Sequence, residues 1–196
     1  MARFSTATTN ELLLAFVSAG DVSAGNTVTA VTGAGLTWTL VRRTNAQRGT
    51  SEVWRAFAAT RLNNVLVTVQ IAQPSPVTAT LVSLSRVDTT GTDGSGAIGA
   101  TASGSAGSGA PTASLVTTRN SSLVLGVGDD WSAAASRSVG SGQTLLHQFL
   151  SGGRTLWVQR AANPIDFGGT TVVINDTSPT TDRFNLTICE VLGKLQ

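Results

Sequence analysis

The sequence predicts an all-β protein, a jelly-roll-like antiparallel β-sandwich, and three observations support this prediction. Short runs rich in Val, Leu, Thr and Trp alternate with clusters of Gly, Asn, Asp and Ser, a pattern typical of strands joined by turns. No stretch of a dozen residues has the apolar period of a helix. Residues that form helices poorly, Gly and Thr above all, are abundant. Many short strands at this spacing indicate a sandwich or a barrel.

Each strand is expected where an apolar or alternating run lies between turn residues. The first is the apolar run 12–17, the next two flank the turn 33–35, and Trp54 marks the fourth. Gly-rich turns at 91–96, 140–142 and 152–153 separate later runs. The predicted strands are 11–18, 27–32, 36–43, 51–59, 65–72, 77–87, 96–103, 112–118, 122–128, 143–149, 154–161, 170–175 and 184–192.

The sequence also contains an apparent internal repeat. Segment 12–17 falls on 123–128 without a gap, and the same shift places 4–6 on 115–117. Later elements match in order: 38–41 with 145–148, 52–55 with 156–159, 65–69 with 171–175, and 81–84 with 186–189. The alternative explanation is chance similarity between β sequences of similar composition. An internal duplication predicts two halves of about five strands that share one core.

We therefore expect one domain over residues 1–196, with pseudo-repeat halves at about 1–90 and 112–196. The length suits a single sandwich. The Gly/Ser-rich segment 91–111 between the halves is interpreted as a flexible or lightly paired crossover, with a strand near its middle. A linker between two separate domains is the alternative.

Composition narrows the class of protein. Charged residues make up only 12% of the chain, so Thr, Ser, Asn and Gln must cover much of the surface, as suits a secreted or particle-bound protein. The net charge is +2 and no basic run exceeds Arg42-Arg43, which argues against nucleic-acid binding. No apolar run approaches eighteen residues, so we expect no membrane insertion. The single cysteine, Cys189, lies in an apolar run and is expected to be buried.

Catalysis is not expected. General acid–base and nucleophilic chemistry usually need a histidine beside an acid, and the chain has one histidine, His147, within an alternating strand. We interpret it as a structural imidazole that is hydrogen-bonded across the sheet. A hydrolase built on the carboxylate pair Asp129 and Asp130 is the alternative.

The candidate ligand-binding residues are Trp131, Asp129 and Asp130. Trp131 follows the two acids in a predicted loop, where an exposed ring would stack on a sugar while the carboxylates accept its hydroxyl hydrogens. The alternative is a Trp that folds back over the end of the sandwich.

The candidate metal ligands are Asp88 and Asp93, in an oxygen-rich loop with some calcium-loop character but no EF-hand pattern. Asx-type turns are the alternative for both acidic pairs. No other cofactor is expected.

Several motifs resemble an uncharacterised β-sandwich module that recurs in large secreted or cell-surface proteins of environmental bacteria, with looser relatives in phage tail proteins. The resemblance rests on the segments 10–17, 35–43, 52–56, 126–131, 143–148, 157–159 and 174–183. It implies a β-sandwich in an extracellular setting, and it implies neither an enzyme activity nor a ligand. The start at Met1-Ala2-Arg3 would then be that of an excised module.

These observations predict a non-catalytic extracellular accessory module. Such a module binds polysaccharide or another surface, or serves as an adhesive or structural spacer. The alternative is a virion or filament structural protein built from a jelly-roll subunit. The sequence leaves the oligomeric state open.

Overall fold

The protein is an antiparallel all-β structure, as predicted. The computed structural model describes residues 3–20 and 26–195, so residues 1, 2, 21–25 and 196 of the predicted domain lie outside the described part. Its elements are β1 (Glu11–Ala19), β2 (Val28–Gly33), β3 (Thr39–Thr44), β4 (Thr50–Ala58), β5 (Val67–Ile71), β6 (Val77–Leu84), the 3-10 turn η1 (Ser95–Ala97), β7 (Ile98–Gly109), β8 (Thr112–Val116), β9 (Leu123–Asp130), β10 (Ser138–Val139), β11 (Gln143–Ser151), β12 (Arg154–Ala161), β13 (Thr171–Ser178) and β14 (Asp182–Val191).

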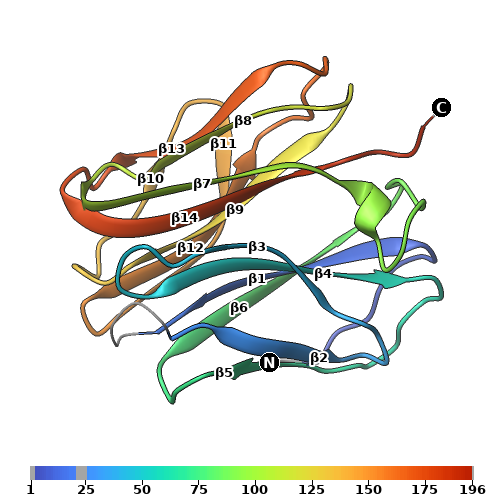
Figure 1. Cartoon of the computed structure of the whole chain (residues 1–196), viewed down its shortest axis with the longest axis horizontal. Helices are drawn as coiled ribbons and strands as arrows, with labels where there is room; N and C mark the ends of the chain where they lie inside the picture. Colours follow the sequence, from blue (N-terminus) through green and yellow to red (C-terminus); the bar gives the residue numbers. More distant parts are fainter. Residues whose placement is uncertain (1–2, 21–25, 196) are drawn as a thin grey trace.

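The strands form four stacked layers, which Figure 1 shows nearly edge-on. Two large central sheets, β3-β4-β1-β6 and β11-β12-β9-β14-β7, face each other. The small sheet β2-β5 covers the outer face of the first, and β10-β13-β8 covers the outer face of the second. Each half of the chain therefore forms a sandwich of its own, and the two sandwiches stack through their larger sheets.

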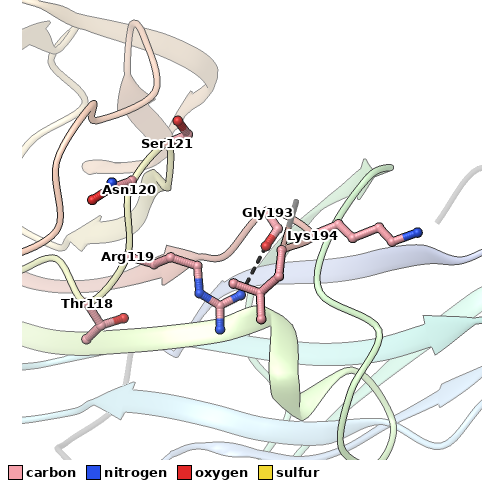
Figure 2. Close-up of a pocket in the computed structure, with 7 residues that line it drawn as sticks. Thr118, Arg119, Asn120, Ser121, Gly193 and Lys194 are labelled. Carbon is pink, nitrogen blue, oxygen red and sulfur yellow. Dashed lines mark hydrogen bonds between the residues drawn. The ribbon is translucent and has the colours of Figure 1, made fainter.

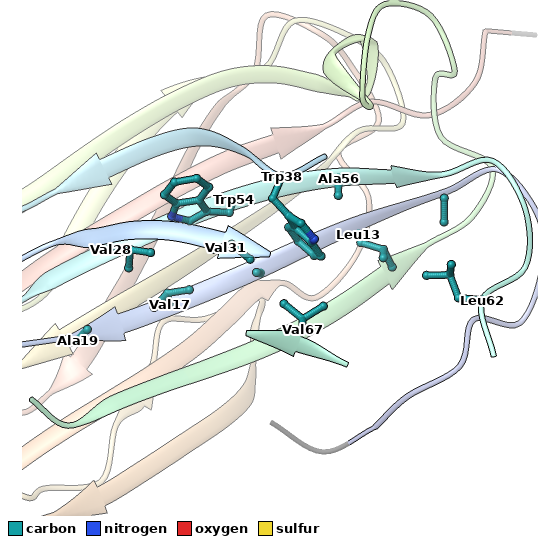
Figure 3. Packing of buried hydrophobic residues seen from close by; sticks show 12 residues of the cluster. Leu13, Val17, Ala19, Val28, Val31, Trp38, Trp54, Ala56, Leu62 and Val67 are labelled. Atoms are coloured by element: carbon teal, nitrogen blue, oxygen red, sulfur yellow. The ribbon is translucent and has the colours of Figure 1, made fainter. Parts of the chain in front are cut away.

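Three apolar clusters fill the spaces between the layers. Trp38 and Trp54 pack with Leu13 and Val67 inside the first half (Figure 3), and Trp157 packs with Ile174 inside the second. These three tryptophans are buried. The third cluster joins the halves and contains Leu12, Leu14 and Phe16 of β1 with Leu125 and Val127 of β9. The halves share this central cluster, and each half also has a cluster of its own.

The apolar run at 12–17 forms β1 because this strand is covered on both faces. All nine of its residues are buried, with alternate side chains entering the first-half cluster and the central cluster. A strand with only one covered face alternates apolar and polar residues, whereas a strand covered on both faces reads as a continuous apolar run. The continuous apolar run thus indicates a strand that lies between two layers of the stack.

The two halves have the same sheet topology. The order β3-β4-β1-β6 recurs as β11-β12-β9-β14, and the small sheet β2-β5 recurs as β10-β13. β3 and β11 also carry an irregularity at the same place, between Leu40 and Arg42 and between Leu145 and His147. The sequence repeat therefore has a counterpart in the pairing of strands.

Strand register defines which residues of the two halves are equivalent. The gapless alignment places Phe16 on Val127. Phe16 pairs with Val53 on one side and Thr80 on the other. Val127 pairs in the same way with Val158 and Thr187. Val53 is therefore equivalent to Val158, and Thr80 to Thr187, and further equivalences follow by counting along each pair of strands.

This register corrects parts of the sequence alignment. The sequence comparison had matched Trp54 with Val158, one position away from the true equivalence. A slip of one residue moves every side chain to the other face of a sheet, and Trp54 and Val158 indeed lie in different clusters. The sequence comparison had also matched Leu81 with Leu186, whereas counting from Thr80 and Thr187 makes Leu81 equivalent to Ile188.

Matching hydrogen bonds of Thr6 and Thr117 agree with the gapless alignment around β1 and β9. The Thr6 amide donates to the Leu62 carbonyl at 3.1 Å, and the Leu62 amide donates back to the Thr6 hydroxyl at 2.8 Å. Thr117, which is equivalent to Thr6, makes the same reciprocal pair with Thr170 at 2.9 and 3.1 Å. The loops before β1 and β9 are therefore attached to their halves in the same way.

The crossover 91–111 contains the turn η1 and all of β7, which extends the predicted strand 96–103 as far as Gly109. β7 adds to the edge of β14, and β8 adds to β13. A Cβ on Gly104 would overlap the Thr112 carbonyl, so small residues in β7 allow β8 to approach closely. The segment that reads as flexible is therefore a strand whose small side chains let two layers meet.

Candidate functional site

A cavity lies where the chain enters β9 and leaves β14. Its volume is about 570 Å³, and its lining comes from residues 118–121 and 193–195. We call it the junction pocket, and Figure 2 shows the labelled side chains around it. Hydroxyl, amide and cationic groups from Thr118, Asn120, Arg119 and Lys194 line its walls. Such groups bind hydroxylated or anionic ligands.

A buried carboxylate beneath the pocket fixes one of its loops. Glu190 accepts hydrogen bonds from the Thr118 amide at 2.8 Å, the Arg119 amide at 3.3 Å and the Ala100 amide at 2.9 Å. Burial alone would raise the pKa of Glu190, but these hydrogen bonds outweigh it and lower the pKa. An ionised acid therefore holds the loop in place while its charge is neutralised by backbone dipoles.

An ion pair forms one wall of the pocket. Arg119 Nη1 lies 2.6 Å from Asp88 Oδ2 and donates to the Gly193 carbonyl at 3.1 Å, the bond drawn in Figure 2. The Asp88 carboxylate also accepts from the Thr90 hydroxyl and amide, at 2.7 and 2.8 Å. The hydrogen bond from the Thr90 hydroxyl and the pairing with Arg119 lower the pKa of Asp88 to about 2. Lys194 is exposed, and its ammonium points away from Arg119.

A second pocket of about 340 Å³ lies at the corresponding place of the first half. Residues 8–10 and 85–87, with Thr89 and Lys194, line it. By counting along the equivalent strands, the segments 8–10 and 85–87 correspond to segments that overlap the lining of the junction pocket. Lys194 borders both cavities, and Arg86 is exposed beside it. The Lys194 amide donates to the Arg86 carbonyl at 2.8 Å, and this bond links the segments that line the two pockets.

Each half fixes its pocket loop with one glutamate, but from a different strand. In the first half Glu11 on β1 accepts from the Thr8 hydroxyl at 2.7 Å and from Ser83 on β6. In the second half the acid is Glu190 on β14, and Ser122 precedes β9. Counting along the strands equates Glu11 with Ser122 and Ser83 with Glu190, so the carboxylate and the hydroxyl have exchanged strands.

The exchange leaves the acid's contact with the loop unchanged. Glu11 accepts a hydrogen bond from the Thr8 amide, and Glu190 accepts one from the amide of Arg119, the residue equivalent to Thr8. The loops that enter β1 and β9 are therefore held at the same backbone position.

The ligand-binding residues expected from the sequence are buried. Trp131 is 7% exposed, and Asp129 and Asp130 are fully covered, so the expectation of an exposed ring was wrong. β9 continues through both acids to the end of the sheet, and the ring folds back over that end. The guanidinium carbon of Arg48 lies 5.7 Å from the Trp131 ring centre, and that of Arg154 lies 5.1 Å away. These contacts occupy the ring that a sugar would need.

Asp129 takes part in the contact between the halves. Its Oδ2 accepts from Asn185 Nδ2 at 3.3 Å, and Asn185 Oδ1 accepts the Ala46 and Gln47 amides at 3.0 and 2.9 Å. Burial raises the pKa of Asp129 well above its usual range, because few charged donors compensate for the lost water. Its role in the structure is to connect β14 and β9 to the loop between β3 and β4.

Asp130 forms a buried ion network with Arg137 and Asp176. Arg137 pairs with Asp130, lies 3.9 Å from Asp176 and stacks 4.4 Å from the Trp157 ring centre. Burial raises the pKa of Asp130 to about 6 and that of Asp176 to about 7, although Arg137 opposes both shifts. Asp130 also accepts the Ser132 amide at 2.6 Å, which is the predicted Asx-type turn.

The loop with Asp88 and Asp93 engages the first residue in an ion pair and both residues in turns. Asp88 pairs with Arg119 and forms an Asx turn with Thr90, and Asp93 has a φ of 50° in the turn before η1. Among residues 3–20 and 26–195, no group of three His, Cys, Asp or Glu side chains could hold a metal ion. The calcium hypothesis therefore has no geometric support from this loop.

His147 and Cys189 have structural surroundings. His147 Nδ1 lies 3.2 Å from Thr80 Oγ1 of β6, so the imidazole bonds to the facing sheet and not across its own. Its side chain is exposed at the edge strand β11. Cys189 is buried in the central cluster as predicted, and burial raises the pKa of its thiol to about 12.

The chain matches no protein-family model, no curated protein and no solved structure. Within the described residues, no helix is long and apolar enough to cross a membrane. The junction pocket was missed in the sequence because its residues, apart from Thr118 at the end of the predicted strand 112–118, lie outside the predicted strands and come from distant segments. One signal was present, since the chain's single lysine, Lys194, lies two residues after the end of the last predicted strand.

Proposed function

We propose that the protein is a non-catalytic accessory module of an extracellular protein and that it binds polysaccharide through the junction pocket. The observation that carries this proposal is that residues with hydroxyl, amide and cationic groups line the pocket. Hydrogen bonds to the buried Glu190 carboxylate fix one of the loops that carry them. Preorganised polar groups favour binding because little side-chain and loop freedom is lost. The exposed Lys194 between two equivalent pockets suits an acidic polysaccharide best.

The surroundings of the ionisable groups support a binding role without catalysis. Glu11, Glu190 and Asp88 use their carboxylates to hold backbone amides or Arg119. His147 has Thr80 as its hydrogen-bond partner at the sheet edge. General acid–base catalysis needs such groups to point toward a shared cleft. The low content of charged residues and the resemblance noted above support an extracellular setting.

The test is retention of the purified protein on insoluble neutral and acidic polysaccharides. Lys194→Ala should weaken retention on the acidic polymers, since it removes the cation that borders both pockets. Arg183→Ala, on β14 and outside the pockets, removes the same charge and should leave retention unchanged. Equal retention of the two variants, or no retention of the parent protein on any polymer, would contradict the proposal.

A second candidate function, a subunit of a larger assembly, is favoured by an apolar patch on the outer sheet. Val116 of β8, Val173 of β13 and the nearby Phe167 are 53%, 47% and 70% exposed. Exposed apolar groups of this size often mark contacts between proteins. Light scattering after size exclusion decides: a large symmetric particle that Phe167→Ser dissociates supports an assembly subunit, and a monomer rejects it.

A further inference from the structure

The pseudo-symmetry between the halves is broken at one sheet edge. In the second half β14 lies between β9 and β7, and residues Phe184 to Cys189 pair with Ala106 to Thr101 of β7. In the first half β6 corresponds to β14 and pairs with β1 on one side. Its other side is an outer edge of the four-stranded sheet, with no strand of the described residues on it. Counting from Thr80 and Thr187, the segment of β14 covered by β7 corresponds to residues 77–82 of β6.

The edge of β6 has none of the features that usually block strand addition. Natural edge strands are protected by Lys, Pro, bulges or shortness. The sequence of β6 is VTATLVSL, without a charge or a proline, and its eight residues pair with β1 in continuous register. An open edge of this kind presents a row of unpaired backbone groups to an extended polypeptide.

A groove follows the same edge. Thr68 and Val69 of β5 and Val77 and Ala79 of β6 line a cavity of about 330 Å³. In the second half, β7 and β8 lie side by side where this opening would be. Val77 and Phe149 of the neighbouring β11 are each 42% exposed. An added strand would cover apolar surface as well as backbone groups.

His147 occupies the position of a residue that holds β7 in the second half. Arg42 of β3 donates to Ser103 Oγ at 2.7 Å and to Thr101 Oγ1 at 3.3 Å, both on β7. Arg42 follows the irregularity in β3 as His147 follows that in β11, and their strand partners, Val53 and Val158, are equivalent. The exposed imidazole thus faces the place where the hydroxyls of an added strand would lie.

We propose that the free edge of β6 binds an extended, uncharged polypeptide strand rich in Ala, Gly, Ser and Thr, antiparallel to β6, as β7 binds β14. The composition follows from β7, IGATASGSAGSG, whose alanines pack inward and whose hydroxyls bond Arg42. At the equivalent edge of β14, the added strand β7 consists of small residues and lies beside β8. This inference is independent of the junction pocket and of polysaccharide binding.

The test uses the complete protein and a fluorescent peptide with the β7 sequence. We expect saturable binding in fluorescence anisotropy, and protection of the amides of residues 77–82 from hydrogen exchange when the peptide is present. A control peptide has Pro in place of both Ala102 and Ser103. It loses two neighbouring backbone donors, one of which must face the edge because donors alternate sides along a strand, so binding should be abolished.

Two matched protein variants locate the site. Val77→Lys places a charge on the proposed edge and should weaken peptide binding by about tenfold or more. Val116→Lys makes the same change at an exposed position of the outer sheet and should leave the affinity unchanged. His147→Ala should weaken binding without changing the thermal unfolding midpoint.

Three results would overturn the proposal. One is the absence of binding by the folded protein, and another is binding that the proline peptide retains. The third is self-association that Val77→Lys abolishes without any peptide binding, since the edge would then pair with a second copy. Polysaccharide retention of Val77→Lys, measured in parallel, shows whether the module's other surface is intact.

Discussion

Glu11 on β1 and Glu190 on β14 hold equivalent loops, although their own positions are not equivalent. At the scale of single residues, the two halves therefore share an interaction but differ in the position of the residue that makes it. Each carboxylate is buried and accepts hydrogen bonds from the loop before β1 or the loop before β9. A buried donor that loses its acceptor costs more than the hydrogen bond contributes, because the group is left without water. The pocket loops therefore depend on one acid each.

This exchange predicts a rescue. Glu190→Ser should lower the free energy of unfolding by about 3 kcal/mol, because several loop amides lose a charged acceptor. The double variant Ser122→Glu/Glu190→Ser, which moves the acid to the strand it occupies in the first half, should recover more than half of that loss. Urea unfolding followed by tryptophan fluorescence measures both.

The control for the rescue is Ser122→Gln/Glu190→Ser, which supplies a side chain of the same size without the charge. It should recover less stability than the relocated acid, because a neutral amide is the weaker acceptor. A relocated acid that is no more stable than Glu190→Ser would refute the equivalence of the two loops.

The buried acids also set a pH dependence. The pKa values of Asp130 and Asp176 are raised to about 6 and about 7, so the folded chain binds these protons more tightly than the unfolded chain. Their contribution to stability is complete below about pH 4, the ordinary Asp pKa, and is lost as pH rises through the folded values. The lowered pKa values of Asp88, Glu11 and Glu190 act oppositely, and their contribution is lost under acid.

Stability should therefore peak near pH 4 to 5 and fall toward pH 8. The urea midpoint at pH 5, 6, 7 and 8 measures this fall. Asp176→Asn should flatten the decline around pH 7, whereas Asp166→Asn, on a loop away from the network, should not. A midpoint that rises from pH 5 to pH 8 would show that the network is fully ionised in the folded state.

At the scale of elements, most strands could be predicted because turn residues bound apolar or alternating runs. Two elements could not be predicted in full. β10 has two residues, too few for any periodicity, and β7 consists largely of Gly, Ala, Ser and Thr, which read as flexible. The predicted site failed for a related reason. Trp131 follows a strand end, but the stacking of the halves that buries this end cannot be read from local sequence.

The close approach of β7 and β8 is testable with two glycines of the same strand. Gly104→Ala places a methyl group against the Thr112 carbonyl and should destabilise the protein by about 2 kcal/mol. Gly107→Ala meets its nearest atom at 3.7 Å and should change stability by less than about 0.5 kcal/mol. Thermal unfolding of both variants gives the comparison. Equal effects would mean that β7 and β8 separate easily.

At the scale of the whole molecule, the central cluster makes the two sandwiches one cooperative unit. Leu12, Leu14 and Phe16 of the first half share it with Leu125 and Val127 of the second. A four-stranded sheet stripped of this contact would expose a complete apolar face to water, which costs about 25 cal/mol for each Å². Neither half is therefore expected to stay folded when the other unfolds.

Calorimetry should accordingly show one unfolding transition, with calorimetric and van't Hoff enthalpies equal. Phe16→Ala should lower the midpoint of that transition by removing about 3 to 5 kcal/mol of stability, and should not split it. Trp38→Ala, inside the first-half cluster alone, should also shift both halves together. Two resolved transitions in either variant would show that the halves unfold separately.

The different strand positions of Glu11 and Glu190 also show how a structural repeat can escape a comparison of sequences. A column-by-column comparison of the halves counts Glu against Ser as a mismatch twice, once at 11 and 122 and once at 83 and 190. Counted instead by location in space, both halves hold one acid and one hydroxyl at the same spot.

The same transposition occurs on β4 and β12. Trp54 donates to Glu52, and Trp157 donates to Gln159, each two positions away on the same strand. Counting from Val53 and Val158 equates Trp54 with Gln159 and Glu52 with Trp157, so the indole and its acceptor have traded places. A search for duplicated halves in β proteins should therefore compare the set of groups gathered at each site, because that set persists after the individual positions have lost their likeness.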